Sequence, residues 1–205
     1  MTLFLFSLFG CAPGTGLLAI GDSVFDWNTD DDQSIPAVAA LDLGLDFQNN
    51  AVAGSLLTGE IPELYEEGDW TWVLVDGGAN DLNEECACSG CDRLLDEMIA
   101  SDGSSGIMAD LVERITGDGH KVALMGYYRV PANASEFTNC VEDSTELNNR
   151  YEGLAAQYDS VIYVASGDVM TPDQIELYDE DLIHPSIKGS RVVGEYIAEK
   201  MRTSP

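Results

Sequence analysis

Basic side chains are scarce in this sequence, which has 9 Lys and Arg residues against 37 Asp and Glu residues. The resulting formal net charge of −28 repels phosphate backbones and anionic lipid headgroups, so we expect no nucleic-acid partner. The charge also disfavours polyanionic substrates unless the site is locally shielded. A solvated surface that keeps the protein soluble, including in salty surroundings, is the simplest interpretation of this acidity.

The sequence also lacks internal repeats, low-complexity tracts and any linker that would divide it. Its 205 residues, 45% of them hydrophobic, are enough to bury a core without outside help. We therefore expect a single domain over residues 17–205, preceded by a separate segment at residues 1–16.

The N-terminal segment has no apolar run long enough to span a bilayer, but Leu3–Phe9 suits the hydrophobic region of a secretory signal. Leu8-Phe9-Gly10-Cys11 resembles a bacterial lipobox, in which the cysteine is lipidated. The alternative is a first core strand of a cytosolic protein. We favour export, and expect a periplasmic or cell-envelope lipoprotein of a bacterium, with a possible membrane tether through Cys11.

Cysteine is also sparse, and with Cys11 set aside four remain. An even number in an exported protein favours two disulfides, with three connectivities open. The Cys-x-Cys-x-x-Cys cluster with one distant Cys is instead compatible with a zinc site. Export favours disulfides, so we expect no resident metal and no cofactor. The four disulfide candidates are Cys86, Cys88, Cys91 and Cys140.

Short apolar segments alternate with segments of helical periodicity along the rest of the chain. This alternation predicts an α/β fold with a mostly parallel five-stranded sheet covered on both faces. The expected strands are the run from Leu17 to Gly21, Asp46–Asn50, the WTWVLV run after Asp69, Lys121–Tyr127 and Val161–Ala165. The expected helices are a segment capped by Ser34 and ended by Gly44, Ser55–Glu67 with an interruption near Pro62, Asp92–Ala100, Gly106–Thr116, Ser144 to about Tyr158, and Ser186–Met201.

The first strand, in LLAIGDSV, stops at Gly21 and delivers Ser23. A buried strand that ends this way can expose a hydroxyl at the carboxyl edge of a sheet, where open α/β folds place their sites. Alone, Gly-Asp-Ser also fits an ordinary turn or a helix N-cap.

Further candidate residues follow other predicted strands or precede the last helix. Gly54 can bring a backbone N–H close to a ligand, and the Asn80 amide can donate to a developing oxyanion. The alternatives are a plain strand-exit glycine and an Asx turn. Asp181 precedes His184 by three residues, a spacing that lets one turn bring the carboxylate to the imidazole. The other histidine, His120, lies on the amino side of a strand, so we expect it to be structural or solvated.

These stretches together resemble the SGNH hydrolases, the GDSL-type esterase and lipase family. The family's four residues stand in order as Ser23 in GDSV, Gly54 in NNAVAGS, Asn80 in GAND and His184 in DLIHP, and the resemblance runs from Leu18 to the end. It implies a three-layer αβα sandwich of the flavodoxin-like type. Val24 replaces the usual Leu. Ser55 stands where family members often carry Asp.

The resemblance implies that Ser23 is the nucleophile, that His184 takes its proton, and that Asp181 orients and stabilises the imidazolium. The oxyanion hole would combine the Ser23 and Gly54 N–H groups with the Asn80 side chain. The predicted function is a serine esterase that acts through an acyl-enzyme on short-chain esters, lysophospholipids, thioesters or acetylated sugars. No long lid is visible in the sequence, so we expect an open cleft and small acyl groups.

Two interpretations stay open at this point. The segment Cys86–Cys91 follows Asn80 and should border the cleft, where its disulfides would limit acyl-chain length or simply staple a loop. A protein of another class, a catalytically silent glycan- or ligand-binding lipoprotein on the same scaffold, is the alternative to an enzyme.

Overall fold

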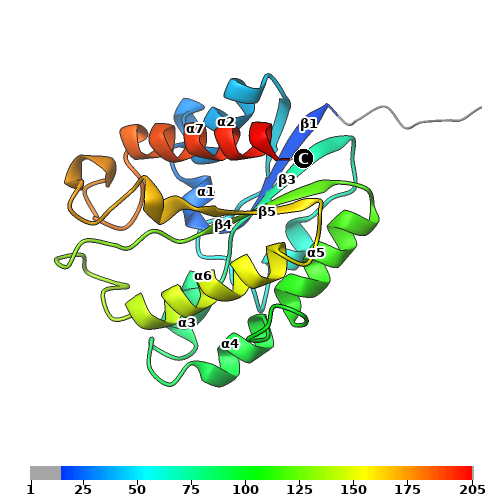
Figure 1. Cartoon of the computed structure of the whole chain (residues 1–205). Coiled ribbons are helices and arrows are strands. Elements are labelled where there is room, and N and C mark those ends of the chain that lie inside the picture. Colours follow the sequence, from blue (N-terminus) through cyan, green and yellow to red (C-terminus); the bar gives the residue numbers. More distant parts are fainter. Residues whose placement is uncertain (1–14, 205) are drawn as a thin grey trace, which may run out of the picture.

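The computed structural model describes residues 15–204, in which five strands form one all-parallel sheet in the order β2-β1-β3-β4-β5 (Figure 1). The predicted α/β class and sheet are confirmed. The predicted signal segment and Cys11 lie outside the described residues. The strands are β1 (Gly16–Ile20), β2 (Asp46–Asn49), β3 (Trp70–Val75), β4 (Lys121–Gly126) and β5 (Val161–Ala165).

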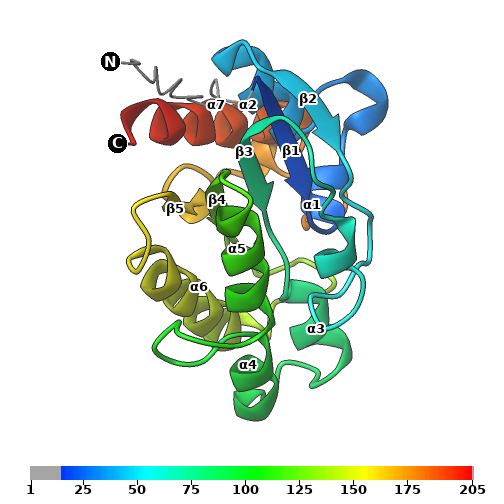
Figure 2. The same cartoon turned by 90° about the vertical axis from the view of Figure 1, so that its right-hand side faces the viewer.

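Helices cover both faces of this sheet, so the domain has three layers (Figure 2). One face carries α1 (Ser23–Asp26), α2 (Ile35–Leu43) and α7 (Ile187–Thr203). The other carries α3 (Ala79–Glu84), α4 (Asp92–Met98), α5 (Ile107–Gly117) and α6 (Val141–Ala155). Short 3-10 turns lie at Thr29–Asp31, Ile61–Leu64, Ser166–Asp168 and Ile175–Leu177. No helix among the described residues is long and apolar enough to cross a bilayer.

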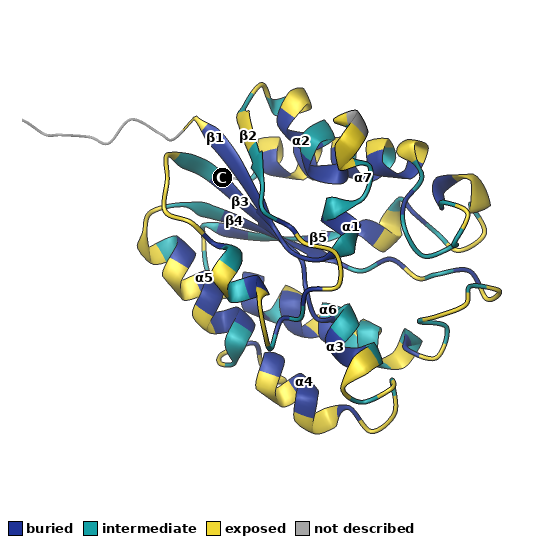
Figure 3. Cartoon of the chain, turned by 180° about the vertical axis from the view of Figure 1, so that it is seen from behind, coloured by how far each residue is buried: buried dark blue, intermediate teal, exposed yellow. Residues whose placement is uncertain are grey.

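The core lies in two halves, one on each side of the sheet, because successive strand residues point to opposite faces. In β1, Leu18 and Ile20 pack on the side of α5 and α6, whereas Leu17 and Ala19 pack on the side of α2 and α7. All four are fully buried. Figure 3 shows the same pattern, with buried central strands between helices whose outer faces are exposed, whereas the edge strand β2 is exposed or intermediate. Burial of each large apolar side chain contributes about 1.5–3 kcal/mol.

The start and stop signals of α2 and α7 act as predicted. Ser34 Oγ accepts a hydrogen bond from Ala37 N, and Ser186 Oγ accepts one from Gly189 N. Gly44 ends α2 with a left-handed φ of 68°, which costs glycine no side-chain clash. The predicted cap at Ser144 is wrong, since α6 begins at Val141, directly after Cys140.

The predicted helix over 55–67 is also wrong, because the only helical part of this segment is the 3-10 turn at Ile61–Leu64. The reason is tertiary: Leu57 N and Thr58 N donate to the buried carboxylate of Asp81, at 2.7 and 2.8 Å, instead of to main-chain carbonyls. This irregular segment, with turns over residues 57–60, follows Gly54 directly, so its path bears on the site described below.

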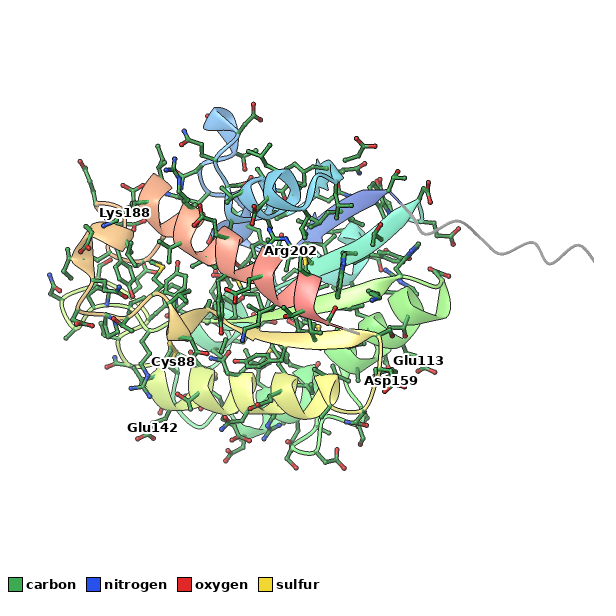
Figure 4. All side chains as sticks on the ribbon, turned by 45° about the horizontal axis from the view of Figure 1, so that its top comes forward. Cys88, Glu113, Glu142, Asp159, Lys188 and Arg202 are labelled. Atoms are coloured by element: carbon green, nitrogen blue, oxygen red, sulfur yellow. A yellow bond between two sulfur atoms is a disulfide. The ribbon has the colours of Figure 1, made fainter. Side chains whose placement is uncertain are left out.

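Two disulfides resolve the connectivity that the sequence left open. Cys86 pairs with Cys91, and Cys88 pairs with Cys140. All four sulfur atoms are thereby used, which rules out the alternative zinc site on these cysteines. The second bond ties the loop after α3 to the first residue of α6 (Cys88 is labelled in Figure 4).

Candidate active site

The predicted site residues meet at the carboxyl end of the sheet. The main chain leaves β1 at Ile20, passes through Gly21 and Asp22, and enters α1 with Ser23 as the first helical residue. The carboxyl ends of parallel strands share one edge, so the segments after β2 and β3 bring Gly54 and Asn80 to the same place. His184 arrives from the loop that precedes α7.

Ser23, His184 and Asp181 form a continuous hydrogen-bonded chain. His184 Nε2 lies 2.8 Å from Ser23 Oγ, and His184 Nδ1 lies 2.5 Å from Asp181 Oδ2. The other Asp181 oxygen accepts the N–H groups of Ile183 at 2.8 Å and His184 at 3.0 Å. With Nδ1–H directed to the carboxylate, Nε2 is free to accept the serine proton, as a general base requires.

The carboxylate of Asp181 is held in its charged form. Burial acts to raise the pKa of Asp181, but the hydrogen bonds from the His184 side chain and from the Ile183 and His184 main chain outweigh burial. The net result is a pKa of Asp181 below its ordinary value. A charged Asp181 can therefore stabilise an imidazolium next to it.

An aromatic ring that the sequence reasoning missed covers the imidazole. Trp27 stacks on His184 with ring centroids 3.8 Å apart and an interplanar angle of 7°. Its Nε1–H donates to Asp179 at 2.7 Å, and Asp179 N donates to the carbonyl of His184 at 2.8 Å. Next to it, Asn28 Nδ2 donates to Pro185 O at 3.0 Å. The turn after α1 thus fixes the loop that carries His184.

Three candidate hydrogen-bond donors lie on the segments that follow β1, β2 and β3. Within the described chain, the N–H groups of Ser23 and Gly54 have no hydrogen-bond partner. Asn80 Nδ2 donates one hydrogen to Ser55 O at 3.1 Å, which leaves its second hydrogen available. Gly54 has a φ of 83°, a left-handed conformation that glycine adopts without strain.

Asp81 holds the Gly54 segment against α3. Besides the N–H groups of Leu57 and Thr58, its carboxylate accepts the Thr58 hydroxyl at 2.7 Å, and the Asp81 residue is fully buried. With the bond from Asn80 to Ser55, adjacent residues of α3 bind both sides of the same turn. Asp81 is therefore a positioning residue that the GAND string contained but whose role only the fold reveals.

Beneath the nucleophile lies a buried acidic pair. Asp22 N donates to Asp76 Oδ1 at 2.9 Å, and Tyr127 donates its hydroxyl to Asp22 Oδ2 at 2.5 Å. Burial, and then the neighbouring charge of Asp22, holds the pKa of Asp76 well above its ordinary value. Burial also raises the pKa of Asp22. A Cβ on Gly21 would lie 1.7 Å from Asp76 Oδ1, so this close approach requires glycine.

A cavity of about 490 Å³ opens beside Ser23 and Asn80, a volume typical of small-molecule sites. It runs between α6 and the segments that follow β4 and β5, and has room for more than the small acyl group expected from the sequence. Cys86–Cys91 contributes no side chain to this lining, so the prediction that this loop borders the cleft is wrong. The loop is linked to the cavity wall by the bond from Cys88 to Cys140, which is the neighbour of the lining residue Val141.

This sheet order, with a Ser-His-Asp chain at its carboxyl edge, is the fold of the SGNH hydrolases. A carbohydrate acetylesterase from Sinorhizobium meliloti superposes with a TM-score of 0.69 at 17% identity, over 91% of this chain and 98% of the other. The inhibitor-bound aryl esterase of M. smegmatis gives 0.67 at 18% identity, over 94% and 100%. A protein from Slackia heliotrinireducens that is assigned as an SGNH hydrolase superposes with a TM-score of 0.65 at 18% identity, over 92% of this chain and 99% of the other.

The chain belongs to the GDSL-like Lipase/Acylhydrolase family, whose model matches residues 19–192. Sequence identities of 17–18% to these structures show that the fold is shared, and they do not establish a shared activity or substrate. No functionally curated protein matches this sequence.

Proposed function

We propose that this protein is a serine esterase that hydrolyses carboxylic esters through an acyl-enzyme. Ser23 Oγ attacks the ester carbonyl while His184 Nε2 takes its proton, and Asp181 stabilises the imidazolium. His184 then protonates the leaving alcohol, which departs and leaves the acyl group on Ser23. In the second half, His184 deprotonates a water that attacks the acyl-enzyme, and the acid is released.

The oxyanion of each tetrahedral intermediate would lie between Ser23 N–H, Gly54 N–H and the free hydrogen of Asn80 Nδ2. Donors that are fixed before the reaction are worth about 3–4 kcal/mol each, because they need no reorganisation when the negative charge forms. The hydrogen bonds of Asn80 and Asp81 to the 55–58 segment support this role, since they fix the turn that carries Gly54.

The observation that carries the proposal is the unbroken chain from Ser23 Oγ through His184 to Asp181. The family and the esterase names of the structural relatives support ester bonds as the target. A silent binding protein would need none of these contacts, and no observation here favours that alternative.

Hydrolysis of p-nitrophenyl acetate by the wild type and by Ser23→Ala tests the proposal. We expect the variant to lose about 10⁴-fold or more in kcat/KM. Circular dichroism should show an unchanged fold, since a small hydroxyl is removed. Equal rates for both proteins would refute the esterase assignment.

We also propose that the protein is an exported bacterial lipoprotein with Cys11 as its lipidated residue. The two disulfides support an oxidising compartment. Expression with labelled palmitate, with Cys11→Ser as the control, tests the proposal. Label in the wild type alone supports it, and an unlabelled cytosolic product contradicts it.

A further inference from the structure

Arg129 is the one Lys or Arg side chain among the described residues that line the cavity beside Ser23. It is exposed, and it has no hydrogen-bond or ion-pair partner in the described part of the chain. The carboxylates in the same lining are Asp22, which Val24 N and Tyr127 already bind, and Glu152, which is exposed. Glu152 and Arg129 form no ion pair with each other.

Most other basic side chains of this acidic protein already have partners. Arg150 binds Asp96 and Glu146, and Arg202 binds Asp42. Lys188 binds Glu176 near the start of α7, and it points outward from the molecule, as Figure 4 shows. With 37 acidic residues available, Arg129 stays unpaired beside the candidate active site, whereas Arg191, which also has no ion pair among the described residues, lies outside this cavity.

The main chain at Arg129 is fixed relative to the candidate base. Tyr178 donates its hydroxyl to Arg129 O at 2.6 Å, and Tyr128 donates its hydroxyl to Ile183 O at 2.9 Å. Ile183 directly precedes His184 in the sequence. Arg129 therefore starts from a defined position next to the loop that carries His184, although its side chain is exposed.

The main chain at Tyr127, two residues before Arg129, is also held by hydrogen bonds. Asn148 on α6 accepts from Tyr127 N and donates to Tyr127 O, each at 2.9 Å. The segment is thus bound on one side by the cavity wall and on the other by the His184 loop. A guanidinium carried on such a main chain can form two parallel hydrogen bonds to a carboxylate.

We propose that the ester hydrolysed at Ser23 carries a carboxylate, which Arg129 binds inside this cavity. The inference rests on the proposed esterase function and narrows its substrate class. A net charge of −28 repels anions over the surface as a whole, so a single unpaired guanidinium in the site selects a monoanionic ester rather than a polyanion. Glu152 opposes such a ligand and limits how much charge the cavity accepts.

Two pairs of esters test the proposal and locate the charge. Mono-p-nitrophenyl glutarate carries the carboxylate on the acyl side, and p-nitrophenyl valerate is its neutral counterpart. 4-Carboxyphenyl butyrate carries the carboxylate on the alcohol side, and 4-carbamoylphenyl butyrate is its neutral counterpart. For each pair, the measured quantity is the ratio of kcat/KM for the charged ester to kcat/KM for the neutral ester.

We expect Arg129→Gln to lower this ratio about 10- to 100-fold for one of the two pairs, the scale of a lost hydrogen bond to a charged group. Arg129→Lys should retain part of it, because a point charge replaces the bidentate fork. Glu152→Gln should raise the ratio. Added salt should narrow the difference between wild type and Arg129→Gln, because the group is exposed.

The matched control is Arg93→Gln, which removes the same charge from α4, outside the cavity, where the side chain is 91% exposed. We expect that variant to leave both ratios unchanged. Unchanged ratios in Arg129→Gln for both pairs, or equal changes in Arg93→Gln, would overturn the proposal. A failure of the wild type to hydrolyse any of the four esters in a Ser23-dependent way would instead overturn the esterase function.

Discussion

The two histidines lie at opposite ends of the same parallel sheet, and their surroundings differ in kind. His184, at the carboxyl end, contacts a hydroxyl, a carboxylate and a stacked indole. His120, directly before the amino end of β4, places Nδ1 2.9 Å from the carbonyl of Trp70, and its ring lies at 66° to that of Tyr65 with centroids 6.4 Å apart. The prediction that His120 is not part of the site agrees with this placement.

The difference teaches that the sheet edge, more than the residue type, decides what a histidine can do. At the carboxyl edge, loops from several strands converge, so one imidazole meets partners from distant parts of the chain. At the amino edge, His120 meets a main-chain carbonyl, which can only accept a hydrogen bond and so fixes Nδ1 as the protonated nitrogen. The comparison can be tested at both ends.

The largest contrast is expected between His184→Ala and His120→Ala. Loss of the base should lower kcat/KM by about 10⁴-fold or more. Loss of His120 should leave kcat/KM within about threefold and lower the free energy of unfolding by about 1 kcal/mol, the worth of one hydrogen bond. Ester hydrolysis and urea unfolding of both variants provide the measurement. Comparable losses of activity in the two variants would contradict the contrast.

The next effect concerns the oxyanion donors at the carboxyl end. Asn80→Ala should lower kcat about 10²- to 10³-fold with little change in KM, because its amide binds charge that develops only in the transition state. Asn83→Ala, on the same helix but outside the cavity lining, is the control. If Asn80→Ala mainly raised KM, the amide would bind the ground state instead.

A smaller effect is expected from the stacked indole. Trp27→Leu should lower kcat about 3- to 30-fold, since an aromatic face stabilises the imidazolium that forms during turnover by about 0.5–2 kcal/mol. Trp27→Phe should recover part of this loss. The control, Trp70→Leu, changes the tryptophan at the amino end of β3.

The last effect concerns stability instead of activity, and it is a pH dependence at the two ends of β3. Protonated Asp76 contributes stability that is complete below pH 3.8, its ordinary pKa, and that is lost as pH rises toward its raised folded pKa. Asn cannot titrate, so Asp76→Asn should lose less stability than the wild type between about pH 4 and pH 8, by up to about 1.4 kcal/mol per pH unit.

Asp69→Asn is the matched control, because it removes an exposed acid just before the amino end of β3. Urea unfolding at a series of pH values should give parallel curves for this variant and the wild type. If Asp76→Asn also ran parallel to the wild type, Asp76 would be ionised in the folded protein.

Local signals predicted those parts of the fold whose structure is set by neighbouring residues. Ser34 and Gly44 bracket α2, and the apolar run Val161–Ala165 matches β5 to the residue. The predicted helix at 55–67 failed because Asp81, more than 20 positions later, binds its N–H groups. The predicted cap at Ser144 failed because α6 starts at the disulfide-bonded Cys140.

The same distinction applies to the site. Ser23, Gly54, Asn80, Asp181 and His184 stand in short strings that the sequence displays directly, and the structure brings them together. Trp27 lies 152 positions from Asp179, to which its indole donates, so no local pattern announces that contact. No local sequence pattern marks Arg129 as a substrate-binding residue, because only the fold places it in the lining of the cavity beside Ser23.

The disulfide between Cys88 and Cys140 divides the chain into a covalent ring and two tails. Ser23 lies on the tail before the ring and His184 on the tail after it, and the ring itself contains α4, α5 and β4. Closing a loop with a sequence separation of 52 restricts the unfolded chain by about 4 kcal/mol. A single backbone cut between residues 91 and 140 would open the ring yet leave nucleophile and base in one covalent molecule.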